Sequence, residues 1–182
     1  METRLTHDQG KLLREIVTPG ERIIDLGYGS GEMALHFASL GAEVHAYDRH
    51  WDWPGEPPPG VAWARSTFII LYERYNADPA FAELIEGSTA FIGWPTNGAS
   101  WDLSSLVRQM PRVIYVGNTF AGMTCGRQDL WAELCCREVL HHMPDRKNSL
   151  IVYGGRAGKR ELLAEEAAAI DEVKVRAYPY DS

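Results

Sequence analysis

The sequence predicts an α/β protein with three layers: a mostly parallel sheet with helices on both faces. Strand-like and helix-like segments alternate along the chain, which is the order expected when crossover helices join parallel strands. Two strand-like runs, residues 22–26 and 112–117, are almost continuously apolar, as is typical of strands covered on both faces. Neither a repeat nor a low-complexity linker divides the 182 residues, so we expect one domain over residues 1–182.

Hydrophobic periodicity and turn residues set the expected elements in order. Helices are predicted over residues 6–16, 32–40, 63–75, 79–85, 103–110, 130–142 and 160–170. Strands are predicted over residues 22–26, 43–47, 89–94, 112–117, 149–153 and 173–178. The last two strands are compatible with an antiparallel hairpin. No good strand candidate lies between the helices predicted over 63–75 and 79–85, so we expect one edge strand of the sheet to be missing or degenerate.

Three of these boundaries have a local chemical reason. Thr6 is the expected N-cap of the first helix, because its hydroxyl can accept a hydrogen bond from a free amide of the first turn. Gly41 is the expected C′ residue of the helix over 32–40. Residues 51–60 contain four prolines and cannot form an ordinary helix or central strand. This loop is either a lid over the ligand that sets specificity, which we favour, or an ordinary rigid surface loop.

The composition is that of a folded protein: 45% of the residues are hydrophobic and 24% are charged. Asp and Glu number 25 against 18 Lys and Arg, so the formal charge is −7 and non-specific nucleic-acid binding is disfavoured. No signal peptide or apolar stretch of about 18 residues is present, and three cysteines form a poor disulfide framework. We therefore expect a cytoplasmic protein without a membrane segment.

The strongest chemical signal is DLGYGSG, residues 25–31. The chain must turn sharply from a buried strand into a helix there, and glycine permits the positive φ angles of such a turn. Gly27, Gly29 and Gly31 also let a ligand lie against the main chain. Asp48 ends the next strand, 17 residues beyond the last glycine, where its carboxylate can accept hydrogen bonds from two vicinal hydroxyls.

The glycine spacing favours a ligand without phosphate. A dinucleotide-binding loop has the pattern GxGxxG, with a small residue at the third site. Glu32 occupies that site here, and its charge near a helix N-terminus would repel a pyrophosphate. The GxGxG spacing after Asp25 suits a ligand with a positively charged amino acid end.

DLGYGSG followed by AYD resembles the first two motifs of the class I S-adenosylmethionine-dependent methyltransferases, which have a Rossmann-like fold. The resemblance implies S-adenosylmethionine as cofactor. It implies that the three loop glycines border the cofactor, that Asp25 faces its methionine end and that Asp48 binds its ribose. Tyr28 could line the same pocket. A plain structural turn with two solvent-facing acids is the alternative.

The end of the fourth strand reads Gly93-Trp94-Pro95-Thr96-Asn97. Methyltransferases that act on exocyclic amino groups often place Asn or Asp, two prolines and an aromatic residue there. This chain keeps one proline, but Trp94 replaces the hydrogen-bond acceptor with a donor, which argues against methylation of a base amino group. Trp94 could pack in the core, contact a planar substrate or mark a lost site. Trp94, Pro95 and Asn97 are the candidate catalytic residues.

Residues 112–126, RVIYVGNTFAGMTCG, together with Trp94-Pro95, resemble a loosely defined group of methyltransferase-like proteins in which SWPP and IYIGE-GGCTG recur. Asn118 stands where that pattern has Glu, which removes a carboxylate base. The loop over residues 118–127 should lie at the carboxyl end of its strand, the edge where ligands bind in open α/β sheets. Cys125 there lacks an evident base. His141 and His142 would point about 100° apart on the predicted helix and could not share an ion, so no metal is expected.

The function indicated is methyl transfer from S-adenosylmethionine to an unknown, small-molecule acceptor held in line with the sulfonium. One alternative is a binding module that keeps the cofactor pocket without turnover, favoured by the altered WPTN motif and the expected loss of an edge strand. A weaker alternative is an NAD-dependent oxidoreductase, which Glu32 disfavours. The identity of the acceptor and the oligomeric state, a homo-oligomer included, are left open.

Overall fold

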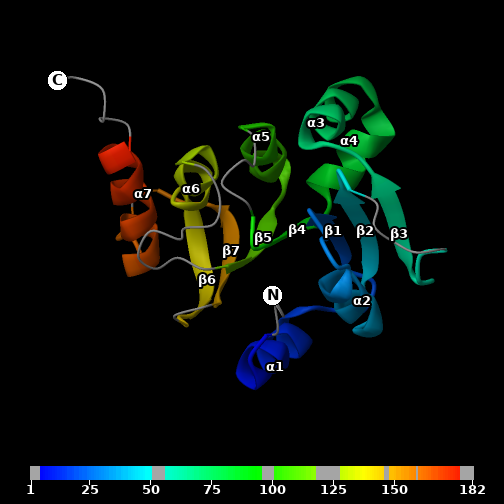
Figure 1. The fold of residues 1–182 in the computed structure, drawn as a ribbon, viewed down its shortest axis with the longest axis horizontal. Coiled ribbons are helices and arrows are strands. Elements are labelled where there is room, and N and C mark those ends of the chain that lie inside the picture. Colours follow the sequence, from blue (N-terminus) through cyan, green and yellow to red (C-terminus); the bar gives the residue numbers. More distant parts are fainter. Residues whose placement is uncertain are drawn as a thin grey trace.

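A computed structural model describes residues 5–50, 56–95, 101–117, 128–145, 148–158 and 160–176. Its centre is one seven-stranded sheet in the order β3-β2-β1-β4-β5-β7-β6 (Figure 1). The strands are β1 (Arg22–Leu26), β2 (Glu43–Asp48), β3 (Val61–Arg65), β4 (Thr89–Gly93), β5 (Arg112–Gly117), β6 (Arg137–Met143) and β7 (Ser149–Arg156). The helices are α1 (His7–Ile16), α2 (Glu32–Ser39), α3 (Phe68–Ala77), α4 (Pro79–Glu86), α5 (Trp101–Gln109), α6 (Gln128–Leu134) and α7 (Ala164–Arg176).

Six of the seven strands point the same way. The five from β3 to β5 pair in parallel, β7 is antiparallel to β5, and β6 is antiparallel to β7. The chain moves outward from β1 to β2 and β3, then returns to the other side of β1 with β4. In open α/β sheets a ligand crevice forms outside the carboxyl ends of the strands where the order reverses in this way.

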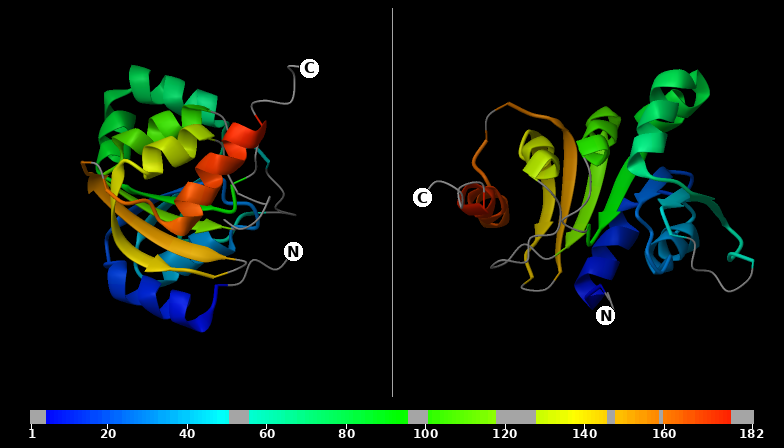
Figure 2. Two further views of the ribbon diagram at one scale, coloured as in Figure 1. Left: turned by 90° about the vertical axis from the view of Figure 1, so that its left-hand side faces the viewer. Right: turned by 45° about the horizontal axis from the view of Figure 1, so that its top comes forward.

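Helices cover both faces of the sheet, so the predicted three-layer α/β arrangement is confirmed (Figures 1 and 2). On one face α1 and α2 bury Leu13 and Phe37 against the inner side chains of the strands. On the other face α3 to α6 form a second core that includes Trp131, and Ala169 of α7 joins it. Among the described helices, none has both the length and the apolar character needed to span a membrane.

Most predicted elements of the first half are found within one or two residues. The Thr6 hydroxyl accepts from the Gln9 amide at 3.2 Å, and the Gln9 side chain accepts from the Thr6 amide at 3.0 Å. This capping box explains where α1 begins. Gly41 follows α2 with φ of 86°, as expected for a C′ glycine.

The prediction of a missing edge strand is wrong. Residues 61–65 form β3, which pairs in parallel with β2 from Val61 opposite Val44 to Arg65 opposite Asp48. The predicted helix over 63–75 therefore begins too early: Thr67 caps α3, and its hydroxyl accepts from the Ile70 amide. The segment VAWAR is only half-buried, as expected at a sheet edge, and lacks the continuous apolar run that marks β1 and β5.

The predicted long helix over 130–142 is also wrong. It divides into α6, a turn at Cys135–Cys136 and β6, which forms an antiparallel hairpin with β7. His141 and His142 consequently lie on a strand and not at a helix end, and His142 Nε2 is 2.8 Å from Glu165 Oε1. The predicted terminal strand over 173–178 is wrong as well, because residues 173–176 continue α7.

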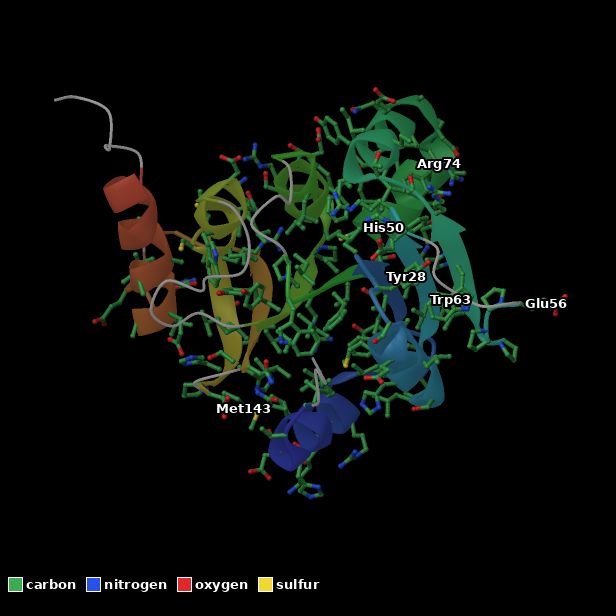
Figure 3. All side chains as sticks on the ribbon, in the orientation of Figure 1. Tyr28, His50, Glu56, Trp63, Arg74 and Met143 are labelled. Atoms are coloured by element: carbon green, nitrogen blue, oxygen red, sulfur yellow. The ribbon has the colours of Figure 1, made fainter. Side chains whose placement is uncertain are left out.

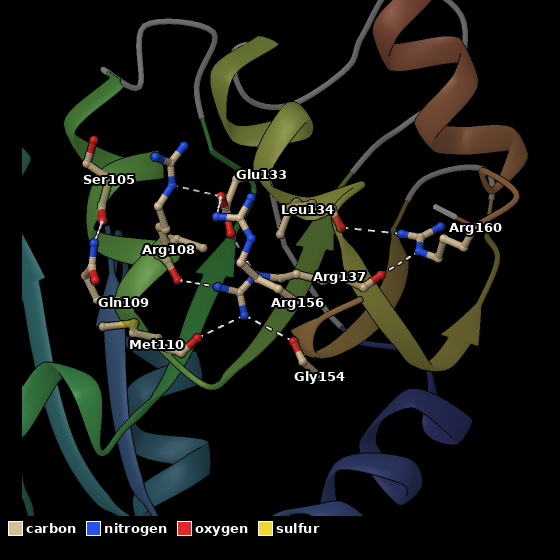
Figure 4. A network of polar contacts seen from close by, with 11 residues as sticks. Ser105, Arg108, Gln109, Met110, Glu133, Leu134, Arg137, Gly154, Arg156 and Arg160 are labelled. Atoms are coloured by element: carbon tan, nitrogen blue, oxygen red, sulfur yellow. Dashed lines mark hydrogen bonds and ion pairs between the residues drawn. The ribbon is translucent and has the colours of Figure 1, made fainter. Parts of the chain in front are cut away.

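A buried charge network fixes the turn between α6 and β6 (Figure 4). The Arg137 side chain is fully buried and donates to the carbonyls of Val107 at 2.6 Å, Met110 at 2.9 Å and Gly154 at 3.1 Å. Its Nε lies 3.3 Å from Oε1 of buried Glu133, out of hydrogen-bond alignment, so this contact is an ion pair. Burial lowers the pKa of Arg137. One guanidinium thus joins α5, α6 and the β6–β7 hairpin.

Candidate functional site

A cavity of about 660 Å³ opens at the carboxyl ends of the parallel strands, beside the point where the strand order reverses. Its walls come from the glycine loop after β1, the end of β2, the β3–α3 connection, the end of β4 and the start of α5. A volume in this range is typical of small-molecule and cofactor sites. The two motifs recognised in the sequence, at residues 25–31 and 48, therefore meet at one cavity.

The glycine loop is fixed by backbone geometry that other residues rarely adopt. Gly27 has φ of 95° and Gly29 has φ of 52°, so a side chain at either position would strain the turn. The Asp48 carboxylate holds the loop from the neighbouring strand: Oδ2 accepts from the Gly29 amide at 3.0 Å, and Oδ1 accepts from the His50 amide at 2.9 Å. A carboxylate has about four lone-pair positions, so these two bonds leave acceptor capacity for a ligand.

Tyr28 lines the cavity without filling it. Its ring meets the Trp63 ring edge-on, with centroids 5.1 Å apart, and its hydroxyl donates to the His50 carbonyl at 3.2 Å. Figure 3 shows the three residues grouped on the side of β1 and β3. Tyr28 is only 6% exposed, because β3 supplies the aromatic partner that covers it.

Asp25 lies beneath the loop and does not line the cavity. It is fully buried in β1, and neither carboxyl oxygen has a hydrogen-bond partner among the described residues. Burial, and secondarily the charge of Asp48, raises the pKa of Asp25 from its ordinary value of 3.8 to about 8. Asp25 is therefore largely protonated at neutral pH. Its contact with the methionine end of a cofactor stays a prediction.

Gly31 does not line the cavity, and its role in the loop is structural. It is the N-cap of α2, has φ of 75°, and its amide donates to the Tyr28 carbonyl at 2.8 Å. The exposed Glu32 follows in the first helical turn and does line the cavity. A carboxylate at this helix start makes the site less favourable for a phosphate.

Trp94 directly follows β4, in a backbone conformation that is unusual for a residue other than glycine. Its φ is 45°, its amide donates to the Val116 carbonyl at 2.7 Å, and its indole Nε1 donates to Asn148 Oδ1 at 2.6 Å. The ring packs against the core under α1 and α2, and Trp94 and Pro95 also line the cavity. Trp94 thus both packs in the core and contacts the cavity, and its only side-chain hydrogen-bond donor is already paired with Asn148.

Other predicted site residues lie outside the described part of the chain. These are Asn97, residues 51–55 of the proline-rich loop, and the loop over residues 118–127 with Cys125. Among the described residues, no cluster of three or more His, Cys, Asp or Glu is arranged to hold a metal ion.

Sequence reasoning missed several residues of the cavity wall, among them Phe68 and Asp102. Phe68 lies in the middle of the predicted helix over 63–75, whereas it is the first residue of α3 and faces the glycine loop, with a ring atom 3.9 Å from the position of a Cβ on Gly27. Asp102, in the first turn of α5, is only 4% exposed and lines the cavity. An acid in a first helical turn is common at the surface, so the sequence had no signal that separated Asp102 from such a residue.

Comparison with solved structures finds a similar fold in several proteins. TehB from Haemophilus influenzae has a TM-score of 0.56 over 85% of this chain and 64% of its own, with 10% identity. Sp1610 of Streptococcus pneumoniae, a candidate tRNA (m1A22) methyltransferase solved with S-adenosyl-L-methionine, has a TM-score of 0.54 over 96% and 84%, with 10% identity. TrmK of M. capricolum, solved with S-adenosyl-homocysteine, has a TM-score of 0.53 over 88% and 73%, with 10% identity.

The chain has the class I methyltransferase fold. At 10% identity the likeness concerns the fold alone, and the chain spans less than two thirds of the TehB chain. The sequence matches no protein-family profile, and no match was found among curated proteins. The acceptor and the site residues must therefore be argued from this chain itself.

Proposed function

We propose that this protein is an S-adenosylmethionine-dependent methyltransferase that acts on a small-molecule acceptor. The observation that carries the proposal is the cavity in which Asp48 holds the glycine loop from the end of the next strand. Bound S-adenosylmethionine would supply a methyl group on a sulfonium that is already activated. The protein then needs mainly to align an acceptor with that methyl group, which requires no strong base.

The residues present fit an adenosyl group with a cationic end. The bare main chain at Gly27 and Gly29 permits close approach, and Asp48 keeps free lone pairs for two ribose hydroxyls. The cavity wall carries the carboxylates of Glu32, Asp48 and Asp102. Arg49 also lines the cavity, but the three carboxylates outnumber this one guanidinium, and a wall with excess negative charge favours a sulfonium and an ammonium over a pyrophosphate.

Loss of Asp48 should weaken cofactor binding strongly. Asp48→Ala removes the carboxylate that would accept from the ribose hydroxyls and that accepts from the Gly29 amide. Hydrogen bonds to a charged group contribute about 1.5–3 kcal/mol each. We expect the affinity for S-adenosylhomocysteine, measured by calorimetry, to fall about 100-fold. Glu43→Ala removes an exposed carboxylate at the opposite end of the same strand and should leave affinity unchanged. Equal affinities for wild type and Asp48→Ala would remove Asp48 from the proposed site.

The acceptor side of the site is proposed to lie at the end of β4, where Trp94 and Pro95 face the cavity. Trp94 offers an aromatic surface but no acceptor for an amino group, because its indole nitrogen only donates. The formal charge of −7 opposes general attraction to a nucleic acid backbone. Both points favour a small acceptor with an apolar or planar part.

The experiment has two steps. Calorimetric titration with S-adenosylhomocysteine tests the pocket, and the absence of heat and of a thermal shift at millimolar ligand would end the proposal. In the second step the protein is incubated with tritium-labelled S-adenosylmethionine and, in parallel reactions, a small-molecule extract or total RNA. The label that enters each fraction is measured. We expect label in the small-molecule fraction. Label confined to RNA would support the methyltransferase activity but contradict the proposed small-molecule acceptor.

A binding module without turnover shares this pocket. Two sequence features favour this alternative. The first, a missing edge strand, no longer supports it, because β3 is present. The second, the altered sequence at the end of β4, still does. Tight binding of S-adenosylhomocysteine together with no label in either fraction would support the module over the enzyme.

A further inference from the structure

Trp94 has a backbone conformation that residues other than glycine rarely adopt. Its φ of 45° lies in the left-handed region, and a bulky residue stays there only where neighbouring contacts hold it. Two hydrogen bonds provide such contacts: the Trp94 amide donates to the Val116 carbonyl at 2.7 Å, and the indole Nε1 donates to Asn148 Oδ1 at 2.6 Å. Strained residues of this kind cluster at ligand sites, and Trp94 lines the cavity.

The order of the strands explains why Asn148 can reach Trp94. β5 lies between β4 and β7 in the sheet, and β7 runs antiparallel to β5, so Ser149 at the start of β7 is opposite Gly117 at the end of β5. Trp94 directly follows β4, and Asn148 directly precedes β7. Both residues therefore lie at the carboxyl edge of the parallel strands, and their hydrogen bond joins the two strands that flank β5.

Asn148 is itself fixed from two sides. Its amide donates to Asp145 Oδ1 at 3.1 Å, within the connection between β6 and β7. Its carbonyl accepts from the side-chain amide of Gln9, a buried residue of α1. The oxygen of the same Gln9 side chain completes the capping box of α1, so the start of this helix directs the Gln9 donor toward Asn148. A chain of contacts thus leads from α1 through Asn148 to the cavity wall.

Asn148 binds the indole from outside the cavity. Trp94 lines the cavity, whereas Asn148 is not among the described residues of its wall. Nε1 is the only polar atom of the indole, so the part of the ring that a ligand meets is carbon. The hydrogen bond also limits the orientation of the ring, because rotation about a side-chain torsion would break it. Asn148 therefore determines which surface of Trp94 faces a ligand.

We propose that Asn148 is a positioning residue for methyl transfer: it holds Trp94 Nε1 and so sets the surface against which the acceptor packs. This inference rests on the proposed function. Methyl transfer needs the acceptor in line with the methyl group, and a displacement of about 1 Å caused by a residue away from the chemistry can lower the rate about 100-fold. The cofactor side should be independent of Asn148, because Asp48 fixes the glycine loop through contacts that do not include it.

The kinetic test compares Asn148→Ala with Asn148→Asp. Tritiated S-adenosylmethionine at saturating concentration is the donor, and the acceptor mixture is the fraction, small-molecule extract or total RNA, that takes label with the wild type. Asn148→Ala should lower the rate of label transfer about 10- to 100-fold, while the affinity for S-adenosylhomocysteine, measured by calorimetry, stays within about twofold. Asn148→Asp keeps an oxygen that accepts from the indole and should stay within about threefold of the wild-type rate.

A spectroscopic test follows the ring itself. The protein is labelled with fluorotryptophan, and Trp94→Phe identifies the fluorine NMR resonance of Trp94. That resonance should shift or broaden in Asn148→Ala, because the indole loses its partner, and should stay close to its wild-type position in Asn148→Asp. This measurement needs no acceptor, so it tests the contact separately from the activity.

Asn76→Ala is the matched control, because Asn76 is an exposed asparagine of α3 outside the cavity wall, and its side chain donates to a carbonyl of its own helix. It should leave both the rate and the Trp94 resonance unchanged. An unchanged rate in Asn148→Ala, or an equal loss of rate in Asn148→Asp, would overturn the positioning role. A fall in affinity for S-adenosylhomocysteine as large as the fall in rate would overturn it in favour of a general structural role.

An unmoved Trp94 resonance in Asn148→Ala would overturn the contact itself, whatever the activity. A wild type that binds no S-adenosylhomocysteine or transfers no label would instead refute the proposed function, and the role of Asn148 in methyl transfer with it.

Discussion

The variant Asp25→Asn is expected to be more stable than the wild type above pH 8, by up to about 5 kcal/mol. The folded protein holds the Asp25 proton up to about pH 8, whereas the unfolded chain releases it near pH 3.8. Each unit of pKa difference between the two states corresponds to about 1.4 kcal/mol. The cause is burial: neither carboxyl oxygen has a partner among the described residues that would stabilise the charge.

The direction follows from proton binding in the two states. Between about pH 4 and pH 8 the folded protein binds one proton more at Asp25 than the unfolded chain does, so this carboxyl lowers the stability as the pH rises. An asparagine side chain does not titrate and removes that contribution. A protonated carboxyl and an amide both leave polar atoms unpaired there, so we expect the wild type and Asp25→Asn to be nearly equal in stability at pH 4.

Urea unfolding at pH 4, 6, 7.5 and 9, followed by circular dichroism, measures the difference directly. The gap between the two proteins should be small at pH 4 and widen with every step. Asp8→Asn, which removes an exposed carboxylate, should follow the wild type within about 1 kcal/mol. Parallel curves for Asp25→Asn and the wild type would mean that Asp25 ionises in the folded protein as freely as in the unfolded chain.

A neutral Asp25 also changes the interpretation of the first motif. The sequence pattern suggests a carboxylate that faces a cationic ligand, yet the structure buries this group one layer below the cavity and keeps it protonated at neutral pH. In the proposed function, the negative charge that a cationic ligand would meet comes from Asp48, Glu32 and Asp102 in the wall. Burial in β1 is the main cause of the raised pKa of Asp25.

The parts of the fold that were predictable have strong local signals. β1 and β5 are apolar runs covered on both faces, and α1 has a capping box that can be read from Thr6 and Gln9. β3 has only one neighbouring strand and is half-buried, so its pattern is weak, and its pairing with β2 over five residues decides its conformation. Tertiary pairing therefore overrode a local helical pattern at residues 63–65.

The site shows the same division between local and non-local causes. The meeting of the glycine loop with Asp48 was predictable, because both follow adjacent parallel strands and parallel strands end at one edge. Asp102 and Phe68 belong to helices that reach the cavity only through the packing of α5 against α3. No residue near Asp102 in the sequence distinguishes it from an exposed acid, so only the folded arrangement identifies it.

The predicted helix over 130–142 failed for a reason that can be tested. Glu133 and Arg137 are four residues apart, the spacing of a stabilising helical ion pair, yet the pair spans the turn between α6 and β6. Arg137 needs this turn, because there its guanidinium also reaches three backbone carbonyls from other parts of the fold. The contact that looks local is thus one member of a non-local network.

Replacing Glu133 by glutamine should therefore cost about 3–5 kcal/mol of unfolding free energy. Glutamine keeps the shape but leaves the buried Arg137 without a counter-charge, and breaking a buried pair on one side is costly in this range. Arg108 Nε, which donates to Glu133 Oε2 at 3.1 Å, loses its charged partner as well. Urea unfolding at pH 7 measures the loss.

Glu15→Gln is the matched control, since Glu15 forms an exposed pair with Lys11 at 3.9 Å that should contribute less than about 1 kcal/mol. A cost for Glu133→Gln as small as that of the control would show that the three carbonyls alone suffice to hold Arg137. The turn would then depend on hydrogen bonds to the backbone and not on the ion pair. A large cost would instead show that the Glu133 charge stabilises the buried guanidinium at this turn, where it also reaches the carbonyls of Val107 in α5 and Gly154 in β7.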